Sequence, residues 1–347
     1  MTPRSRATLA TVAAAAGVSV ATVSKVHNGR SDVSPSTRAR VQEVLQQHDY
    51  FCRRPEPTGK ATVELFLGGM SNYGLDVIEG VLDEARAAGV DIVVSSQPRD
   101  PQAVKPVRAA PWIRQLTATG RVAVIGVNIK LTATDLAVLA RARLPLVVID
   151  PIDIPQLDII SVGSTNFAGG LVATQHLLSL GHNKIAYLGG PATASCNQAR
   201  MQGFRGAMEA AGKHVPPNYV QLRDFRYEDG LEGGAALLDL PEPPTAVFAG
   251  CDQVALGVIE AARNRGLRVP EDLSIVGFDD TQLARLASPP LTTIRQPLRE
   301  MGAVALRTAL QLAAGEKIDS HHVELATNLI VRASAVTETR LAAVVES

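Results

Sequence analysis

The first fifty residues carry apolar positions at helical spacing, separated by residues that begin or end helices. An alanine-rich stretch, Leu9–Ala16, stops before Gly17, and Ser19 can cap a second helix over about Val20–Asn28. A third helix is expected over Pro35–His48, because proline suits the first helical turn. Helix, short turn and helix are typical of a helix-turn-helix unit. A small shared core is expected from Leu9, Val12, Ala13, Ala16, Val18, Val23, Val26, Val41, Val44 and Leu45.

From Ala61 onward, short β-rich apolar runs alternate with helical segments. This alternation predicts parallel strands joined by helices that cover both faces of a sheet, and the length fits two sheets of about six strands each. Buried strands are expected at Thr62–Leu67, Ile92–Ser95, Val122–Val127, Leu146–Ile149, Lys184–Gly189, Ala246–Ala249 and Ser274–Phe278. Helices that stop before a glycine are expected at Val77–Ala88, Gly170–Leu180, Arg200–Ala211, Gln253–Arg265 and Met301–Ala314.

The two parts of the chain also differ in charge. The 347 residues hold 34 basic and 34 acidic side chains, but residues 1–60 carry nine lysines and arginines against four acids. A basic head on an acidic body favours a polyanionic partner for the head. The three cysteines, Cys52, Cys196 and Cys251, have no metal-site or disulfide-framework spacing, so we expect a reducing cytoplasm and no metal. Neither a membrane-spanning run nor a signal peptide is expected.

The head contains a specific set of short motifs: Ala16-Gly17-Val18-Ser19, Thr22-Val23-Ser24, Asn28, Val33-Ser34 ahead of Thr37-Arg38, and Tyr50. In these residues it closely resembles the DNA-binding head of the LacI family of bacterial transcription regulators. The resemblance implies that the second helix enters the DNA major groove.

Within the head, the resemblance places Val20, Ala21 and Lys25 at base edges. Val20 and Ala21 can read only thymine methyls or shape, whereas Lys25 can donate to guanine O6 or N7. The family more often has arginine at that last position, and lysine lacks the two-pronged geometry of arginine. Phosphate contacts, which position the protein without reading sequence, are expected from Ser19, Thr22, Ser24, Asn28, Arg53 and Arg54.

Residues 51–61 depart from the family pattern, which has a short hinge helix with a leucine that wedges into the minor groove. Here Pro55 and Pro57 precede Gly59, and no leucine occurs between Leu45 and Leu65. Because proline and glycine oppose helix formation, we expect an extended linker and a weaker bend at the operator centre.

The resemblance continues through the body and implies a domain like a periplasmic sugar-binding protein, with two doubly wound parallel-sheet subdomains and a ligand cleft between them. The implied boundaries are a head at 1–50, a linker at 51–61 and a body at 62–340. Within the body, one subdomain takes about 62–163 plus 295–324, and the other takes about 164–294 plus 325–340. The matching stretches are residues 170–177, 180–182, 185–190, 252–257, 274–280 and 290–297.

Ligands of open α/β sheets bind beyond the carboxyl ends of the strands. That rule selects Gly68–Tyr73, Asn128, Asp150, Cys251-Asp252 and Asp279, and the resemblance adds Arg200, Phe225 and Gln296. The resulting effector-binding set is Tyr73, Asn128, Asp150, Arg200, Phe225, Cys251, Asp279 and Gln296.

Several of these side chains also have purely structural interpretations. Asp252 and Asp280 could be helix N-caps, Arg200 could pair with a neighbouring acid, and Phe225 could belong to the core. The histidines His176 and His182 are expected to be structural. Cys251 stands where the family commonly has asparagine, so an amide contact to the effector is missing or comes from elsewhere.

Together these features predict a cytoplasmic, homodimeric repressor that binds a palindromic DNA operator under the control of a small effector, most simply a sugar or glycoside. The alternatives are a purine or a protein co-regulator as the trigger, and a sugar-binding protein without a regulatory role. We found no catalytic motif of the common hydrolase, metalloprotease, phosphate-loop or dinucleotide type, and we expect no cofactor and no enzymatic activity.

Overall fold

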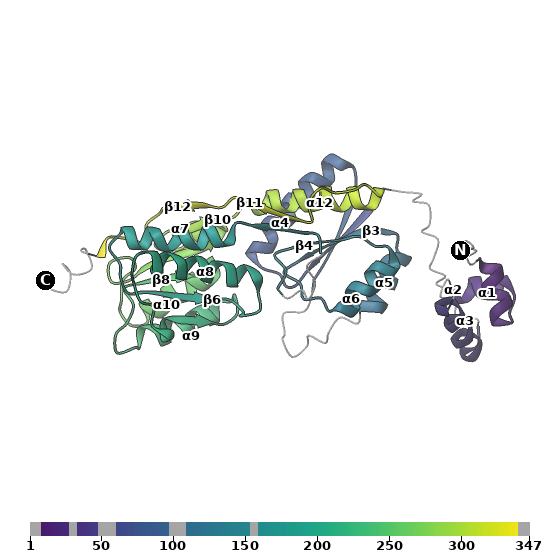
Figure 1. Cartoon of the computed structure of the whole chain (residues 1–347), viewed down its shortest axis with the longest axis horizontal. Helices are drawn as coiled ribbons and strands as arrows, with labels where there is room; N and C mark the ends of the chain where they lie inside the picture. Colours follow the sequence, from purple (N-terminus) through teal and green to yellow (C-terminus); the bar gives the residue numbers. More distant parts are fainter. Residues whose placement is uncertain (1–7, 28–32, 48–59, 97–108, 153–158, 339–347) are drawn as a thin grey trace.

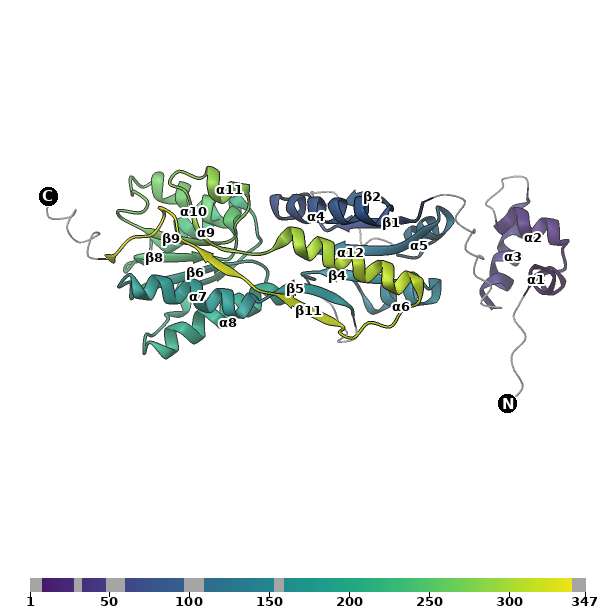
Figure 2. The same cartoon turned by 90° about the horizontal axis from the view of Figure 1, so that it is seen from above.

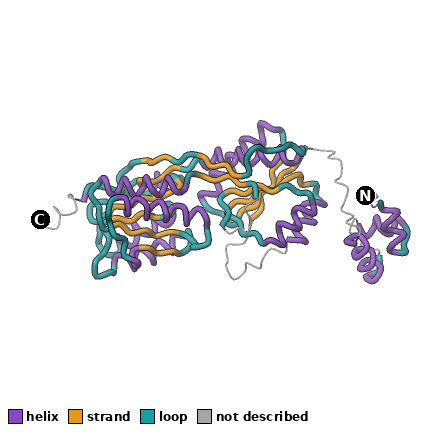
Figure 3. Tube along the Cα trace, in the orientation of Figure 1, coloured by secondary structure: helices purple, strands orange, loops and turns teal. Residues whose placement is uncertain are grey.

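A computed structural model describes residues 8–27, 33–47, 60–96, 109–152 and 159–338 (Figure 1). Among these residues the chain forms a helical head followed by two α/β subdomains, each with strands enclosed by helices (Figure 3). The predicted fold class, a helix-turn-helix head followed by two doubly wound parallel-sheet subdomains, is therefore confirmed.

The head contains helices α1 (Leu9–Ala16), α2 (Val20–His27) and α3 (Pro35–Gln47), which begin and end within one residue of the predicted bounds. Thr8 caps α1, and Gly17 ends it in the left-handed conformation that the sharp turn requires. The buried core consists of Val12, Ala13, Ala16, Val23, Val26, Val41 and Val44. No single helix in the described part of the chain is long and apolar enough to cross a membrane. Only α1 joined with Val20–Val26 reaches that length and composition, across a 98° bend.

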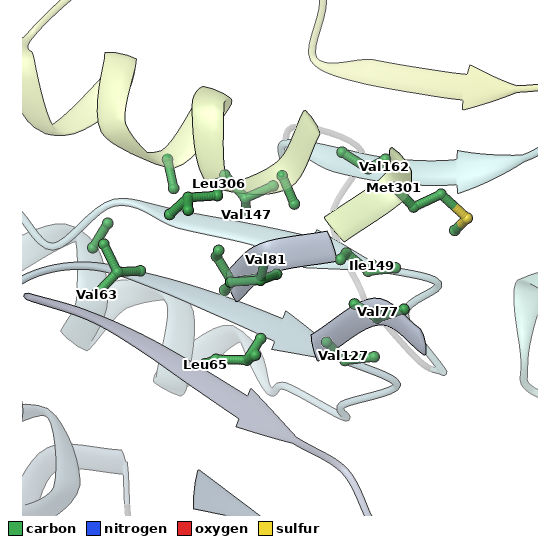
Figure 4. Close-up of a cluster of buried hydrophobic side chains, with 14 of the residues drawn as sticks. Val63, Leu65, Val77, Val81, Val127, Val147, Ile149, Val162, Met301 and Leu306 are labelled. Atoms are coloured by element: carbon green, nitrogen blue, oxygen red, sulfur yellow. The ribbon is translucent and has the colours of Figure 1, made fainter. Parts of the chain in front are cut away.

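The first subdomain is built on a six-stranded, all-parallel sheet in the order β11-β5-β4-β3-β1-β2. Two helices, α4 and α12, cover one face, and the buried side chains between them and the sheet are shown in Figure 4. The other face carries α5 and α6. The strands are β1 (Thr62–Leu67), β2 (Asp91–Ser96), β3 (Arg121–Val127), β4 (Leu146–Ile149), β5 (Ser161–Ser164) and β11 (His322–Leu325). The helices are α4 (Asn72–Ala88), α5 (Ala109–Ala118), α6 (Ala133–Ala142) and α12 (Leu298–Ala314).

The second subdomain has a six-stranded sheet in the order β12-β10-β9-β8-β6-β7, parallel except for the antiparallel edge strand β12. Helices α7 and α8 pack on one face and α9 and α10 on the other. The strands are β6 (Ile185–Gly189), β7 (Val220–Leu222), β8 (Ala246–Ala249), β9 (Ser274–Asp279), β10 (Thr292–Arg295) and β12 (Asn328–Ile330). The helices are α7 (Asn166–Ser179), α8 (Ser195–Ala210), α9 (Tyr227–Leu238), α10 (Asp252–Arg263) and α11 (Gln282–Leu286).

Several sequence predictions need correction. The run Ile92–Ser95 forms a strand, but β2 lies at the sheet edge, so Val93 is 36% and Val94 is 42% exposed rather than buried. Helices α4 and α8 each begin five residues before the predicted Val77 and Arg200, and α7 begins four residues before the predicted Gly170. In α4 the Ser71 hydroxyl accepts a hydrogen bond from the Gly74 amide and caps an earlier first turn.

The chain passes between the subdomains three times: after β5, after β10 and after β11. Figure 2 shows β11 and α12 returning along the first subdomain after the chain leaves the second. Hydrogen bonds join these crossovers to one another. The Thr165 amide donates to the Leu325 carbonyl at 2.9 Å, and the hydroxyls of Thr165 and Thr327 lie 2.9 Å apart.

Helices α7 and α8 are in backbone contact through two glycines. A Cβ atom at Gly170 would overlap the Arg200 carbonyl of α8, and one at Gly203 would overlap the Phe167 carbonyl of α7. The same reciprocal arrangement joins α9 to α10 through Gly230 and Gly257. Since Arg200 lies in the α7–α8 contact, the closeness of these helices sets the position of its side chain.

This contact predicts that Gly203→Ala destabilises the protein by about 1–3 kcal/mol, because an added methyl group forces α7 and α8 apart. Gly206→Ala in the same helix is the matched control, since its Cβ would lie 3.9 Å from the nearest atom, Phe167 Cζ. The control should be neutral or gain up to about 1 kcal/mol from its higher helix propensity. Denaturant unfolding of both variants measures the difference, and equal stabilities would contradict the close contact.

Candidate functional site

A cleft with a cavity volume of about 80 Å³ lies between the two subdomains, at the carboxyl ends of their parallel strands. Side chains from both subdomains line it, which is the arrangement expected for a ligand site in an open α/β sheet. The lining residues are Ser71, Asn72, Tyr73, Asn128, Asp150, Cys196, Arg200, Phe225, Cys251, Gln253, Asp279, Thr281 and Leu283.

Three strand ends turn sharply into the cleft. Asn128 after β3, Asp150 after β4 and Asp279 at the end of β9 have φ values of 50°, 41° and 110°. Positive φ is costly for most side chains, and Asn and Asp tolerate the left-handed region best. These residue types therefore serve both the turn and the cleft. Gly68, at the end of β1, approaches the Asn128 carbonyl so closely that a Cβ would overlap it.

The first subdomain contributes a tyrosine–aspartate pair to the cleft. The Tyr73 hydroxyl, from the first turn of α4, donates to Asp150 Oδ2 at 2.7 Å. Burial raises the pKa of Asp150, while Arg200 and the hydrogen bonds from Tyr73 and Asn166 oppose that shift. Burial and the neighbouring carboxylate Asp150 also raise the pKa of Tyr73, so its hydroxyl keeps its proton and remains a donor.

The second subdomain contributes a buried arginine. Arg200 is only 2% exposed, and it donates from Nε to Asn166 Oδ1 at 2.8 Å and from Nη1 to the Gly250 carbonyl at 2.7 Å. Its Cζ lies 3.8 Å from the centre of the Phe278 ring. A guanidinium held by hydrogen bonds and an aromatic face has little freedom to reorient. It therefore presents its remaining N–H groups in a fixed direction.

Asp279 connects this arginine to the crossovers. Its Oδ1 lies 3.6 Å from Arg200 Nη1 and accepts a hydrogen bond from Gln296 Nε2 at 2.6 Å. The Ser164 hydroxyl donates to Gln296 Oε1 at 2.6 Å, so two of the three crossovers meet at this amide. Burial raises the pKa of Asp279 to about 7, against the opposing effects of Arg200 and Gln296.

The structure brings seven of the eight expected effector-binding residues to the cleft lining. Gln296 is the exception: it is 4% exposed and lies behind Asp279, with both ends of its amide already hydrogen-bonded. Phe225 lines the cleft and also packs against the core, so both of its interpretations apply.

The two aspartates with a possible N-cap role are instead bonded to side chains and a backbone amide in other segments. Asp252 accepts from the Thr281 amide and hydroxyl and from the Thr293 hydroxyl. Asp280 pairs with Arg295 and Arg332.

Sequence reasoning missed Cys196, which lines the cleft one helical turn before Arg200 on α8. Residues four apart in a helix share a face, so the spacing from Arg200 was the available signal. His182, expected to be structural, is fully buried and bonds to Thr245 and to the Val336 carbonyl.

The helix-turn-helix presents the expected small and apolar residues on its surface. Ser19 caps α2 by accepting from the Thr22 amide at 3.1 Å, and its hydroxyl lies 2.8 Å from that of Thr22. Val20 is 46% exposed, and Ala21 and Lys25 are exposed as well. Asn28, Arg53 and Arg54 lie outside the described residues, as does most of the linker at 51–61.

The raised pKa of Asp279 predicts a pH-dependent affinity for a hydroxylated ligand of the cleft. Hydroxyl groups donate to the ionised carboxylate, so binding should strengthen as the pH rises through about 7 and Asp279 loses its proton. The expected gain is about tenfold between about pH 6 and 8, measured by titration calorimetry. Asp279→Asn should bind more weakly and with little pH dependence. A wild-type affinity that stays flat over this range would contradict the assignment.

Comparison with known proteins places the whole chain in one family. Residues 8–52 match bacterial regulatory proteins of the lacI family, and residues 174–335 match the periplasmic binding protein-like domain. The HTH-type transcriptional regulator DegA of Bacillus subtilis (strain 168) is 36% identical over 335 residues, covering 95% of this chain and 98% of DegA. Catabolite control protein A of Priestia megaterium is 31% identical over 336 residues, covering 94% of this chain and 98% of the relative.

Solved structures agree with these relatives over nearly the full length. A transcriptional regulator CelR–cellobiose complex superposes with a TM-score of 0.72 at 31% identity, covering 95% of this chain and 100% of that one. The lac repressor dimer bound to operator and the anti-inducer ONPF has a TM-score of 0.69 at 27% identity, covering 96% of this chain and 100% of that one. The chain therefore belongs to the lacI family of bacterial regulatory proteins and is a DNA-binding transcription regulator.

Proposed function

We propose that the protein is a cytoplasmic, homodimeric repressor whose operator affinity is set by a sugar bound between its subdomains. The observation that best supports this proposal is a chain of hydrogen bonds. The cleft residue Asp279 accepts from Gln296, which in turn accepts from Ser164 at the crossovers. A ligand that pulls on Asp279 acts directly on the segments about which the subdomains move. The protein works by binding rather than by catalysis, in keeping with relatives that are named as transcriptional regulators.

The chemistry of the cleft favours a neutral sugar. Paired hydroxyls need both acceptors and donors, and Asp150, Asn128 and Asp279 supply acceptors while Arg200 supplies donors. Two carboxylates face one guanidinium, a balance that disfavours phosphorylated sugars. The CelR–cellobiose complex shows that a relative of similar fold holds a saccharide, which supports the same ligand class here.

The proposed DNA contact is made by α2. Val20, Ala21 and Lys25 would face base edges, while Ser19, Thr22, Ser24 and, beyond the described segments, Asn28, Arg53 and Arg54 would face phosphates. One head makes few contacts, so two heads reading a palindrome multiply the affinity. The proposed division is a head at 1–50, a linker at 51–61 and a body at 62–340, with the subdomain boundaries stated above.

An exposed apolar surface on the first subdomain suits the proposed dimer. Leu75 and Leu82 of α4 are 50% and 39% exposed, and Val93 and Val94 lie on the adjacent edge strand β2. Figure 2 shows α4 and β2 along one side of the molecule, the side that also carries α11. Exposed apolar patches of this kind mark interaction sites. The lac repressor, a relative, is a dimer when bound to its operator, which supports a dimer here.

Two alternatives differ in what the cleft or the head does. A purine effector would use the Tyr73 and Phe225 rings for stacking, and a protein co-regulator would leave the cleft empty. A sugar-binding protein without a regulatory role would bind the same ligands but would show no preference for any DNA sequence. A ligand panel and an operator selection together separate all of these.

Replacing Lys25 with Ala is expected to relax the preference at one base pair in each half-site and to cost about 1–3 kcal/mol of specific binding, if Lys25 donates to guanine. Binding to a library of single-base operator variants measures this preference. Gln42→Ala, at an exposed position of α3, controls for general effects on the head. Equal weakening on every sequence would make Lys25 a phosphate contact instead.

A thermal-shift panel of monosaccharides, disaccharides, sugar phosphates and purines tests the effector class. A ligand at about 100 times its dissociation constant adds about 2.7 kcal/mol of stability, so one neutral sugar should raise the melting temperature clearly.

In Arg200→Ala that shift and the response to the sugar should be lost while operator binding persists, whereas Arg205→Ala, on the exposed face of the same helix, should behave as wild type. A shift with purines alone would overturn the sugar assignment. Loss of operator binding in Arg200→Ala would assign that residue to the fold.

A further inference from the structure

The cleft wall of the second subdomain contains two cysteines beside its arginine. Cys196 lies in the first turn of α8, one turn before Arg200, and Cys251 directly precedes α10 at its N-cap. Both line the cleft, and the Phe225 ring lies on the same wall, packed against Gly190. Two thiols and a phenyl ring therefore surround one guanidinium.

Neither thiol is prepared for reaction. Both are free and buried, and burial raises the pKa of Cys196 to about 12 and raises that of Cys251 further, so both remain protonated at physiological pH. Cys251 occupies an N-cap position without making a side-chain capping bond. A neutral buried thiol behaves as a small apolar group that is a weak donor and a weak acceptor.

The polar groups close to these thiols are already hydrogen-bonded. The Gly250 carbonyl accepts from Arg200, and the Thr281 hydroxyl donates to Asp252. The Tyr187 hydroxyl donates to Asn197 Oδ1 at 2.6 Å. The remaining N–H groups of Arg200 and the carboxylate of Asp279 are the groups near the thiols that can pair with a ligand hydroxyl, and they lie beside the two thiols and the phenyl ring.

The opposite wall has a different character. Ser71, Asn72, Tyr73, Asn128 and Asp150 of the first subdomain all present polar atoms to the cleft. The second subdomain also presents Arg200, Gln253, Asp279 and Thr281, so the cleft has one polar wall and a second wall that is apolar only at the patch of Cys196, Phe225 and Cys251. A ligand that fits it has hydroxyls on one face and only C–H groups on part of the other.

We propose that the effector is a deoxy sugar whose methyl or methylene group lies against Cys196, Phe225 and Cys251. This inference rests on the proposed sugar-responsive function and specifies its ligand class. A hydroxyl that points at these three side chains, away from Arg200 and Asp279, would be buried without a partner, because neither thiols nor a phenyl ring replace the hydrogen bonds it makes in water. Discrimination of about 10- to 100-fold is expected from an apolar subsite of this kind.

The test compares matched sugars on the full-length protein by titration calorimetry. The pairs are D-fucose with D-galactose, L-fucose with L-galactose, L-rhamnose with L-mannose, and 2-deoxy-D-glucose with D-glucose, together with the deoxy derivatives of any sugar that raises the melting temperature. We expect one deoxy sugar to bind at least about tenfold more tightly than its parent.

Two substitutions test whether the preference for a deoxy sugar depends on the two cysteines. Cys251→Asn adds an amide and Cys196→Ser adds a hydroxyl, from different helices, and each should move the affinity ratio toward the parent sugar by about tenfold. Cys52→Ser, in the linker segment, is the matched control and should leave the ratio unchanged. Because the two changes lie in separate segments, failure of one variant to fold leaves the other as a test.

The outcomes separate this inference from the function beneath it. The deoxy preference is overturned if each parent sugar binds at least as tightly as its deoxy form. That result leaves the sugar-responsive regulator in place. A deoxy preference that survives both cysteine substitutions overturns the assignment to this wall. Binding of no sugar at all overturns both proposals together.

Discussion

A buried arginine holds together the ligand cleft and the connection between the subdomains. Arg200 is fixed by Asn166 in α7, by the Gly250 carbonyl after β8, by the Phe278 ring and by Asp279. Its helix can reach these partners because α7 and α8 touch through backbone at Gly170 and Gly203. Buried ion pairs contribute little net stability, since desolvation offsets attraction. Their value here is a fixed geometry, in which moving one partner moves the others.

That geometry explains how a small ligand can affect a distant DNA-binding head. Asp279 passes a displacement to Gln296, which is hydrogen-bonded to Ser164, and Thr165 next to it joins Leu325 and Thr327. Hydrogen bonds therefore connect all three crossovers. A ligand with unequal affinity for two arrangements of these segments shifts the population between them. The head follows because its linker leads directly into β1 of the first subdomain.

Much of this fold can be predicted from the sequence, and the failures have identifiable physical causes. The head helices were found because Gly17, Ser19 and Pro35 mark their ends, and central strands were found because they are continuously apolar. The edge position of β2 was missed because an apolar run looks the same in the centre of a sheet as at its edge. The apolar pattern does not predict the short strands β5, β10, β11 and β12, because long-range pairing at the crossovers defines them. In the cleft, strand-end residues were predictable, whereas the position of Gln296 behind Asp279 depends on which crossovers meet.

The central claim is that ligand binding in the cleft and operator binding by the head are energetically coupled. Coupling is reciprocal, so it can be read from the ligand side. The direct measurement is the effector's dissociation constant for the full-length protein, alone and saturated with a palindromic duplex selected by the protein from a random library. The account predicts that the two constants differ by about 5- to 150-fold. Equal dissociation constants with and without DNA, for a protein that binds both the effector and the duplex, would contradict the account.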